Sequence, residues 1–157
     1  MNWTRQSLSR IAARAAGGAL GIALMETLAS LADAPLMTVP FATSIVLVMG
    51  APESPPAVPR AILGGHVVSA LAGVLCTMVL GDALWVSAVG VGLAIAAMQA
   101  LDVFHPPAGI NPIIVTTAHA THLFVLFPVA TGALILIAFA WAYHRTTSSD
   151  AWPERWL

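Results

Sequence analysis

The sequence has few charged residues and no lysine. Charged side chains make up 8% of its 157 residues, and hydrophobic side chains make up 59%. A soluble domain carries about 25% charged residues, so seven acids and six bases cannot cover a water-facing surface. This excludes an ordinary soluble domain, a disordered segment and a nucleic-acid-binding protein. The lone cysteine, Cys76, also excludes a disulfide bond within the chain.

What the sequence does contain is long apolar runs, with a mean hydropathy of +0.88. Four runs come close to the about 20 residues that a helix needs to cross the hydrocarbon layer. These runs are residues 15–32, 61–80, 84–101 and 123–143. The sequence therefore predicts a single-domain, all-α membrane protein with four long transmembrane helices.

Two shorter apolar stretches lie between these runs, at residues 39–50 and 107–118. A helix of this length rises about 18 Å and is too short to span the bilayer alone. Pro40 and Pro107 stand at their starts, and proline suits the first turn of a helix. The stretches therefore predict two proline-led half-helices, which either cross with the help of flanking loops or re-enter from one side.

The arginines indicate the orientation. All six bases are arginine: Arg5, Arg10, Arg14, Arg60, Arg145 and Arg155. Six crossings would place all of them on one side of the membrane, as the positive-inside rule requires. We therefore expect an integral protein of a bacterial inner membrane, with both termini cytoplasmic. Hairpins in place of the short crossings would instead put Arg60 outside.

The ends of the chain are expected to lie at the inner interface. Residues 1–14 mix arginines with Trp3, Leu8 and Ile11, which is typical of an interfacial helix. Residues 144–157 form a cytoplasmic tail that ends with interfacial tryptophans. A cleavable signal peptide is the competing interpretation of the start, but Glu26 inside its apolar stretch argues against it.

The two halves of the chain resemble each other weakly. At one constant offset the pairs are Pro40 with Pro107, Ala42 with Gly109, Ser44 with Asn111 and Gly65 with Gly132. Each half, residues 15–80 and 84–143, would hold a long, a short and a long span. An odd number of spans makes the second half inverted relative to the first, which predicts a 3+3 inverted repeat.

The inversion would aim the starts of the two short helices at a shared region. A helix N-terminus carries free N–H groups and about half a positive charge. Two such ends facing one cavity would form an anion site without a basic residue. Ser44 and Asn111, one turn into the short helices, either bind the anion or hold helices together. Thr43 is a weaker partner of Ser44.

With these residues in view, the chain resembles the HPP family of integral membrane proteins. The naming motif is His105-Pro106-Pro107, within DVFHPPAGINPII. A second block, PFATSIVLVMGAPESPPAVPRAILGGHVVSA, covers residues 40–70. The resemblance extends over about residues 12–143, and members are usually described as having four membrane helices. It implies a transporter of a small inorganic anion, and nitrite in particular, which is attributed to cyanobacterial and plastid members. Ile110, Asn111 and Pro112 depart from the family pattern.

Several residues are candidates for the substrate site. His105 can donate a hydrogen bond to an anion or change its charge near neutral pH, or it can cap the short helix that follows. Pro106 and Pro107 fix the start of that helix, which also contains Gly109. Arg60 either meets an incoming anion, anchors to phosphates or pairs with Glu53. His66 lies beside two glycines that allow close backbone approach.

Glu26 is the acid that lies well inside a span. An acid is costly inside a membrane, so its presence there indicates a function. It is the candidate for proton coupling; the alternatives are a protonated side chain or a pair with His66 or another chain. His105 with Asp102, and His119 with His122, are spaced for helical pairs, but the two pairs are predicted at opposite faces. We therefore expect no metal site, no cofactor and no enzymatic activity.

The sequence thus supports two functions. The first is membrane transport of a small inorganic anion, most favourably nitrite, at opposed half-helix N-termini. The alternative is a non-transporting membrane module that acts as a sensor or scaffold. The expected partners are the lipid bilayer, the anion and further copies of the chain, since six short spans enclose little volume.

Overall fold

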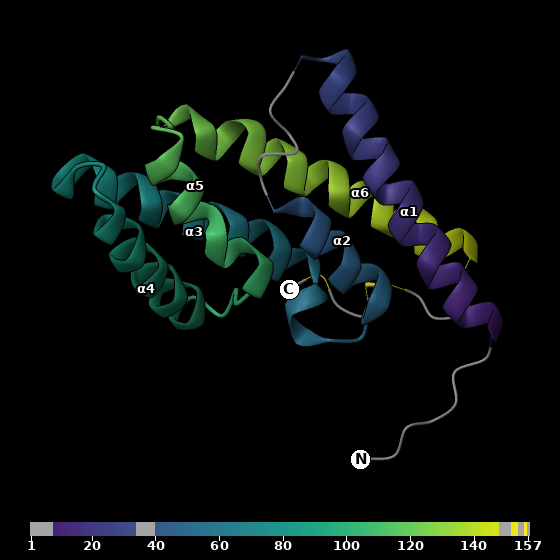
Figure 1. The fold of residues 1–157 in the computed structure, drawn as a ribbon. Helices are drawn as coiled ribbons and strands as arrows, with labels where there is room; N and C mark the ends of the chain where they lie inside the picture. Colours follow the sequence, from purple (N-terminus) through teal and green to yellow (C-terminus); the bar gives the residue numbers. More distant parts are fainter. Residues whose placement is uncertain (1–7, 34–39, 148–151, 154–155, 157) are drawn as a thin grey trace.

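The structure is a computed structural model that describes residues 8–33, 40–147, 152–153 and 156. The described residues form six α-helices, whose lengths follow the order long, short, long, long, short, long (Figure 1). They are α1 (Leu8–Leu31), α2 (Phe41–Gly50), α3 (Pro59–Leu80), α4 (Leu84–Ala100), α5 (Asn111–Thr117) and α6 (Thr131–Thr147). Three short helical turns accompany them: η2 (Pro55–Ala57), η3 (Pro106–Ile110) and η4 (Val125–Ala130). The prediction of an all-α fold is confirmed for the described residues.

Three of these helices are long and apolar enough to cross a membrane: α1, α3 and the kinked helix Val125–Thr147, which joins η4 to α6. The α4 helix is equally apolar but has 17 residues, so it rises about 26 Å. The long span predicted at residues 84–101 is therefore a shorter helix than the other three. A glycine just before it, Gly81, has a positive φ of 81°, which lets the chain turn sharply from α3 into α4.

The second predicted half-helix, residues 107–118, is divided in the structure. The turn η3 comes first, and α5 starts only at Asn111 and has seven residues. Pro106, Pro107 and Pro112 lack an N–H group, so they cannot donate the bonds of a continuous helix and are confined to first turns. The start of this segment consequently offers fewer free amide hydrogens than a regular helix end would.

Two further boundaries differ from the prediction. The helix α1 begins at Leu8, so the expected border between an interfacial segment and the first span, at residue 14, lies inside one continuous helix. Residues 8–16 contain no proline or glycine and several alanines, which favour an uninterrupted helix. The last span is kinked, because Phe127 adopts extended backbone angles immediately before Pro128, as residues before proline prefer.

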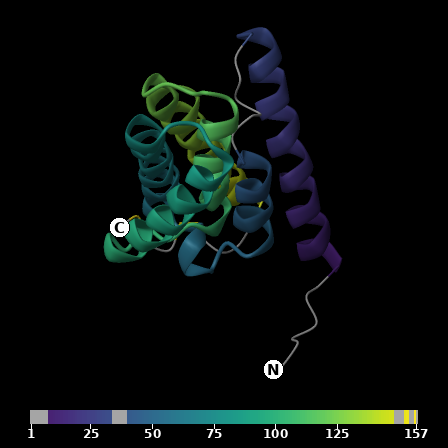
Figure 2. The same ribbon diagram turned by 60° about the vertical axis from the view of Figure 1, so that its left-hand side comes forward.

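The helix α1 lies along one side of the bundle, against α2 and α6 (Figures 1 and 2). Small residues allow the close approach: a Cβ atom on Gly17 would lie 2.6 Å from the ring of Tyr143, and one on Gly21 would lie 2.9 Å from that of Phe139. The hydroxyl of Tyr143 also donates to the carbonyl of Ala13, at 2.7 Å. The contacts move toward the start of α6 as the chain proceeds along α1, so the two helices are antiparallel.

The other side of the molecule is formed by α3, α4, η3 and α5, which pack closely on one another. Gly73 on α3 and Gly90 on α4 both face Pro112, and Cβ atoms there would lie 2.7 Å and 2.9 Å from it. The core accordingly has two buried apolar clusters. The larger one is built mainly from α2, α3, η4 and α6, and the smaller one comprises Ala72, Ala94, Met98, Val103 and Ala108.

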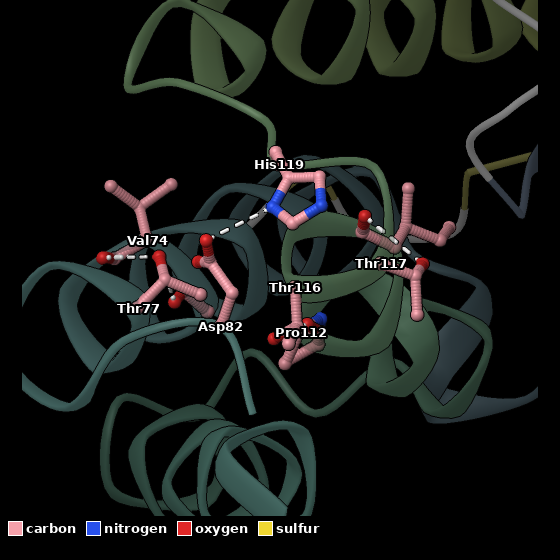
Figure 3. A network of polar contacts seen from close by, with 9 residues as sticks. Val74, Thr77, Asp82, Pro112, Thr116, Thr117 and His119 are labelled. Atoms are coloured by element: carbon pink, nitrogen blue, oxygen red, sulfur yellow. Dashed lines mark hydrogen bonds and ion pairs between the residues drawn. The ribbon is translucent and has the colours of Figure 1, made fainter. Parts of the chain in front are cut away.

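The two short helices run toward opposite ends of the molecule. At the end of α2, the guanidinium group of Arg14 donates to the carbonyl of Gly50. Beyond α5, His119 pairs with Asp82, which follows the end of α3 (Figure 3). Both short helices begin near His66, in the interior of α3. The expected opposed arrangement of their starts is therefore present in the structure.

Candidate functional site

Four polar side chains from separate segments meet at the starts of the two short helices. Ser44 comes from α2, His66 from α3, His105 from the loop before η3, and Asn111 from the first position of α5. All four are fully buried, with 0% relative exposure. The sequence predicted each of them as a site residue, and the structure brings them into one cluster, which we call the histidine cluster.

A close backbone contact places His105 within reach of α3. A Cβ atom on Gly65 would lie 2.6 Å from the Cβ of His105 and 2.9 Å from the carbonyl oxygen of Val103. Any larger side chain at position 65 would push this segment away. The imidazole rings of His66 and His105 consequently lie with their centroids 5.1 Å apart.

The hydroxyl of Ser44 bridges the two rings. Its Oγ lies 2.9 Å from Nε2 of His66 and 2.8 Å from Nε2 of His105. On the far side, Nδ1 of His105 lies 2.7 Å from the carbonyl oxygen of Pro56. Since a carbonyl oxygen only accepts, Nδ1 of His105 carries a hydrogen, and its Nε2 is the acceptor in a neutral ring.

The remaining hydrogens follow from this assignment. Ser44 has one hydroxyl hydrogen, which goes to the unprotonated Nε2 of His105 at 2.8 Å rather than to the carbonyl of Pro40 at 3.3 Å. The oxygen of Ser44 then accepts from Nε2 of His66. The other nitrogen of His66, Nδ1, accepts from Nδ2 of Asn111 at 3.3 Å. The cluster is thus a directional chain of hydrogen bonds between neutral groups.

Asn111 ends this chain and also joins two helices. Its Nδ2 donates to the backbone carbonyl of His66 at 3.1 Å, in addition to the imidazole. This contact fixes the orientation of the amide, because the opposite orientation would place two oxygens against each other. Its Oδ1 atom is buried and has no hydrogen-bond partner among the described residues, so one strong acceptor in the cluster is unfilled.

Two neighbours of the cluster were not predicted from the sequence. The ring of Phe41 lies 5.0 Å from that of His66 and covers it on the α2 side. Ser69, which is also fully buried, donates to the carbonyl of Ala108 at 2.7 Å and attaches η3 to α3. The signal for Ser69 was present, because it follows His66 by three positions and shares its helical face.

The proline motif lies next to the cluster rather than inside it. Pro106 is exposed and Pro107 half-buried, and the carbonyl of His105 accepts from the amide of Ala108 at 3.0 Å. The half-buried Gly109 has open space where a Cβ would be. These residues shape the turn that follows His105.

Three other predicted site residues lie away from the cluster. Thr43 is exposed, and its hydroxyl donates to the carbonyl of Pro40. Arg60 donates to the carbonyl of Leu101 at 2.9 Å and lies 3.6 Å from the carboxylate of Asp102, so it holds the start of α3 to the end of α4. Glu26 is on the exposed side of α1.

Polar contacts at the opposite end of the molecule are separate from the histidine cluster. Figure 3 shows Nδ1 of His119 facing the carboxylate of Asp82, 3.0 Å away. Thr77 there donates to the carbonyl of Val74, and Thr116 to that of Pro112. Both threonine bonds lie within their own helices, and the pair of His119 with Asp82 joins the loops that follow α5 and α3. None of these contacts involves a residue of the histidine cluster.

Chemically, the histidine cluster offers hydrogen-bond donors and acceptors without a fixed charge. Each ring can gain a second hydrogen, and the bridging hydroxyl can reverse its direction. A buried group with these properties can stabilise a passing anion or relay a proton. In the arrangement seen here the four side chains satisfy one another, apart from Oδ1 of Asn111.

The fold and the cluster define an all-helical integral membrane protein with a polar site inside its helical bundle. Residues 3–153 match the family described as "HPP, transmembrane region", and the chain belongs to this family. It is also similar to two transmembrane proteins of Dictyostelium discoideum, each 32% identical over 124 residues. These matches cover 74% of the chain but only 40% and 44% of the relatives, so the chain spans less than half of their length. No solved structure matches it.

Proposed function

We propose that this chain transports a small inorganic anion across the membrane, and that nitrite is the substrate. The observation that carries the proposal is the histidine cluster. Ser44, His66, His105 and Asn111 converge from four segments at the starts of two oppositely directed short helices. Buried polar groups in a membrane protein are costly and mark substrate or ion pathways, and transporters typically bind substrate where helices are interrupted.

The inverted repeat is part of this proposal. Two repeat-related glycines make corresponding contacts: Gly65 on α3 faces the segment before η3, and Gly132 on α6 faces Phe41 at the start of α2. Each of these long helices therefore packs, at its glycine, against the segment where the short helix of the other half begins. A site between two such halves can open alternately to either side when one half rocks against the other.

The charge distribution supports cytoplasmic termini in a bacterial inner membrane. Arg14 is hydrogen-bonded to the last residue of α2, and Arg60 lies at the start of α3, which follows after a short connection. Arg145 lies in the last turn of α6, which the contact between Tyr143 and Ala13 brings to the start of α1. Arg5 and Arg155 lie outside the described residues. This concentration of arginine fits the inner side.

Flux into liposomes tests the proposal. Purified protein is expected to accelerate nitrite entry over protein-free liposomes, and His105→Ala should abolish the acceleration, because that variant removes the ring that links Ser44 to Pro56. His119→Gln is the matched control, since it removes an exposed histidine at the other end. If neither nitrite, nitrate nor formate shows protein-dependent flux, the transport proposal fails. Saturation and counterflow would distinguish a carrier from a channel.

A second candidate function is a non-transporting sensor or scaffold. One observation favours it: the four cluster residues are fully buried and bonded mainly to one another, with the ring of Phe41 packed against them. Such a cluster can have a purely structural role, in which its hydrogen bonds specify one arrangement of the helices. Under this alternative, His105→Ala would destabilise the protein while wild-type liposomes show no flux for any anion tested.

Both proposals involve assembly and exclude chemistry on a substrate. The exposed surface carries many large apolar side chains, among them Leu20, Leu71, Leu75 and Leu93, which fit lipid or another copy of the chain. We propose a homo-oligomer in the bilayer, with no enzymatic activity. Cross-linking in native membranes would give the number of copies.

A further inference from the structure

The hydrogen-bond chain in the histidine cluster is one hydrogen short of completion. Its donors are all used: two hydrogens on Nδ2 of Asn111, one on His66, one on Ser44 and one on His105. The acceptor that remains unfilled is Oδ1 of Asn111, which is buried without a partner. An unfilled buried acceptor costs about 1–3 kcal/mol, so Oδ1 is the atom of the cluster at which one additional hydrogen can be accepted.

We propose that the histidine cluster is a binding site for a single proton, and that filling it releases α5 from α3. The proton enters at Nδ1 of His66, the ring nitrogen that accepts from Asn111. A protonated Nδ1 becomes a donor and repels Nδ2 of Asn111. The amide then turns so that its unfilled Oδ1 accepts the new hydrogen, and the Nδ2 group leaves both Nδ1 and the backbone carbonyl of His66.

This rearrangement has a structural consequence for α5. In the unprotonated form, Nδ2 of Asn111 also donates to the backbone carbonyl of His66. Turning the amide breaks this bond together with the bond to Nδ1. Asn111 is the first residue of α5, so both polar contacts between that residue and α3 change in one step. The proton thereby acts on the junction between the two halves of the molecule.

The groups around the histidine cluster are mostly uncharged. Among the described residues, the titratable group that faces each imidazole ring is the other ring. From α2 the cluster meets Ser44 and Phe41, and from η2 it meets the carbonyl of Pro56, none of which titrates. Arg60 and Asp102 pair with each other, 3.6 Å apart. Two rings bridged by one hydroxyl repel each other when both are charged, so the site takes one proton rather than two.

The proton site deepens the proposed function and depends on it only for its link to the anion. A proton that enters with the anion cancels its charge, which lowers the cost of moving it through the bilayer. This assigns proton coupling to His66 and His105 instead of Glu26, which lies on the exposed side of α1.

Nitrogen NMR of the full chain, labelled with ¹⁵N-histidine in lipid nanodiscs, tests the site without any transport measurement. At neutral pH the hydrogen is expected on Nδ1 of His105 and on Nε2 of His66, with His66→Gln and His105→Gln giving the assignments. Acidification should add one hydrogen, at Nδ1 of His66, together with a shift of the side-chain amide signals of Asn111. Asn111→Asp, which offers only acceptors, should already show a protonated His66 at neutral pH.

The outcomes separate this proposal from the transport proposal. If both rings stay neutral in the wild type and in Asn111→Asp over the whole pH range in which the protein is folded, the proton site is refuted, whatever the flux. Independent protonation of both rings refutes it as well. If the single proton binds but no anion moves, the site stands and the transport proposal fails. If nitrite flux occurs and Glu26→Gln, rather than His66→Gln, removes its acceleration by an inward proton gradient, coupling at the cluster is refuted.

Discussion

The hydroxyl of Ser44 lies 2.8 Å from Nε2 of His105, although the two residues are 61 positions apart in the chain. This single contact joins α2 to the loop before η3, and through the second bond of the hydroxyl it also reaches α3. The short helix α2 is thus connected to the motif that precedes the short helix α5. Much of the proposed mechanism depends on this hydroxyl.

Replacing Ser44 by alanine is expected to weaken both the fold and the function. The variant leaves two buried imidazole nitrogens without their shared partner, at a cost of about 1–3 kcal/mol. We expect a lower midpoint of thermal unfolding in detergent and loss of nitrite flux. The adjacent Thr43→Val is the control, because Thr43 is exposed and, among the described residues, its hydroxyl bonds to the carbonyl of Pro40. Equal loss in the two variants would contradict the role given to the cluster.

The packing of α5 against α3 and α4 leaves no room at Gly73. A Cβ atom there would lie 2.7 Å from the Cα of Pro112, and backbone cannot move aside as a flexible side chain can. Gly73→Ala should therefore destabilise the protein by about 1–3 kcal/mol and shift Asn111, which precedes that proline. Gly92→Ala is the matched control, since no atom lies within 4 Å of its added Cβ. Unfolding of both variants in the same detergent would compare them, and an unchanged Gly73→Ala would show that α5 can retreat.

The sequence was informative about the site because polar residues are conspicuous in an apolar chain. The sequence alone predicts Ser44, His66, His105 and Asn111 as site residues, and it predicts the opposed arrangement of the short helices. The link between His66 and the others could not be predicted. It depends on the contact of Gly65 with the backbone before η3, and hydropathy carries no information about which helix faces which.

The errors of prediction also have physical causes. The sequence suggested a regular half-helix over residues 107–118, yet three missing N–H groups, at Pro106, Pro107 and Pro112, divide it into η3 and α5. The proposed anion site therefore depends less on bare helix ends than on side chains. Thr43, Arg60 and Glu26 were predicted from residue type and position along the chain, which do not tell which way a side chain faces, and the structure places them away from the cluster.

The contacts of Arg14 predict an asymmetric response to mutation. Arg14 donates to the carbonyl of Gly50 and pairs with Glu53 at 3.2 Å, and its side chain is 19% exposed against 61% for that of Glu53. Exposed ion pairs contribute about 0–1 kcal/mol, so Glu53→Gln should change the stability little. Arg14→Gln should cost more, because it also removes the donor at the end of α2. Unfolding of the two single variants and of the double variant would measure the difference; a larger effect of Glu53→Gln would contradict it.

The orientation predicts which loops can be labelled from each side of the membrane. In a Cys76→Ala background, a cysteine in place of Thr146, at the end of α6, should react with a membrane-impermeant maleimide only after the cells are opened. A cysteine in place of His122, beyond α5, should react in intact cells. Both positions are exposed in the structure, so lack of reaction reports the membrane and not burial. If the cysteine at position 146 reacts in intact cells, the last helix ends outside, and the predicted cytoplasmic C-terminus is wrong.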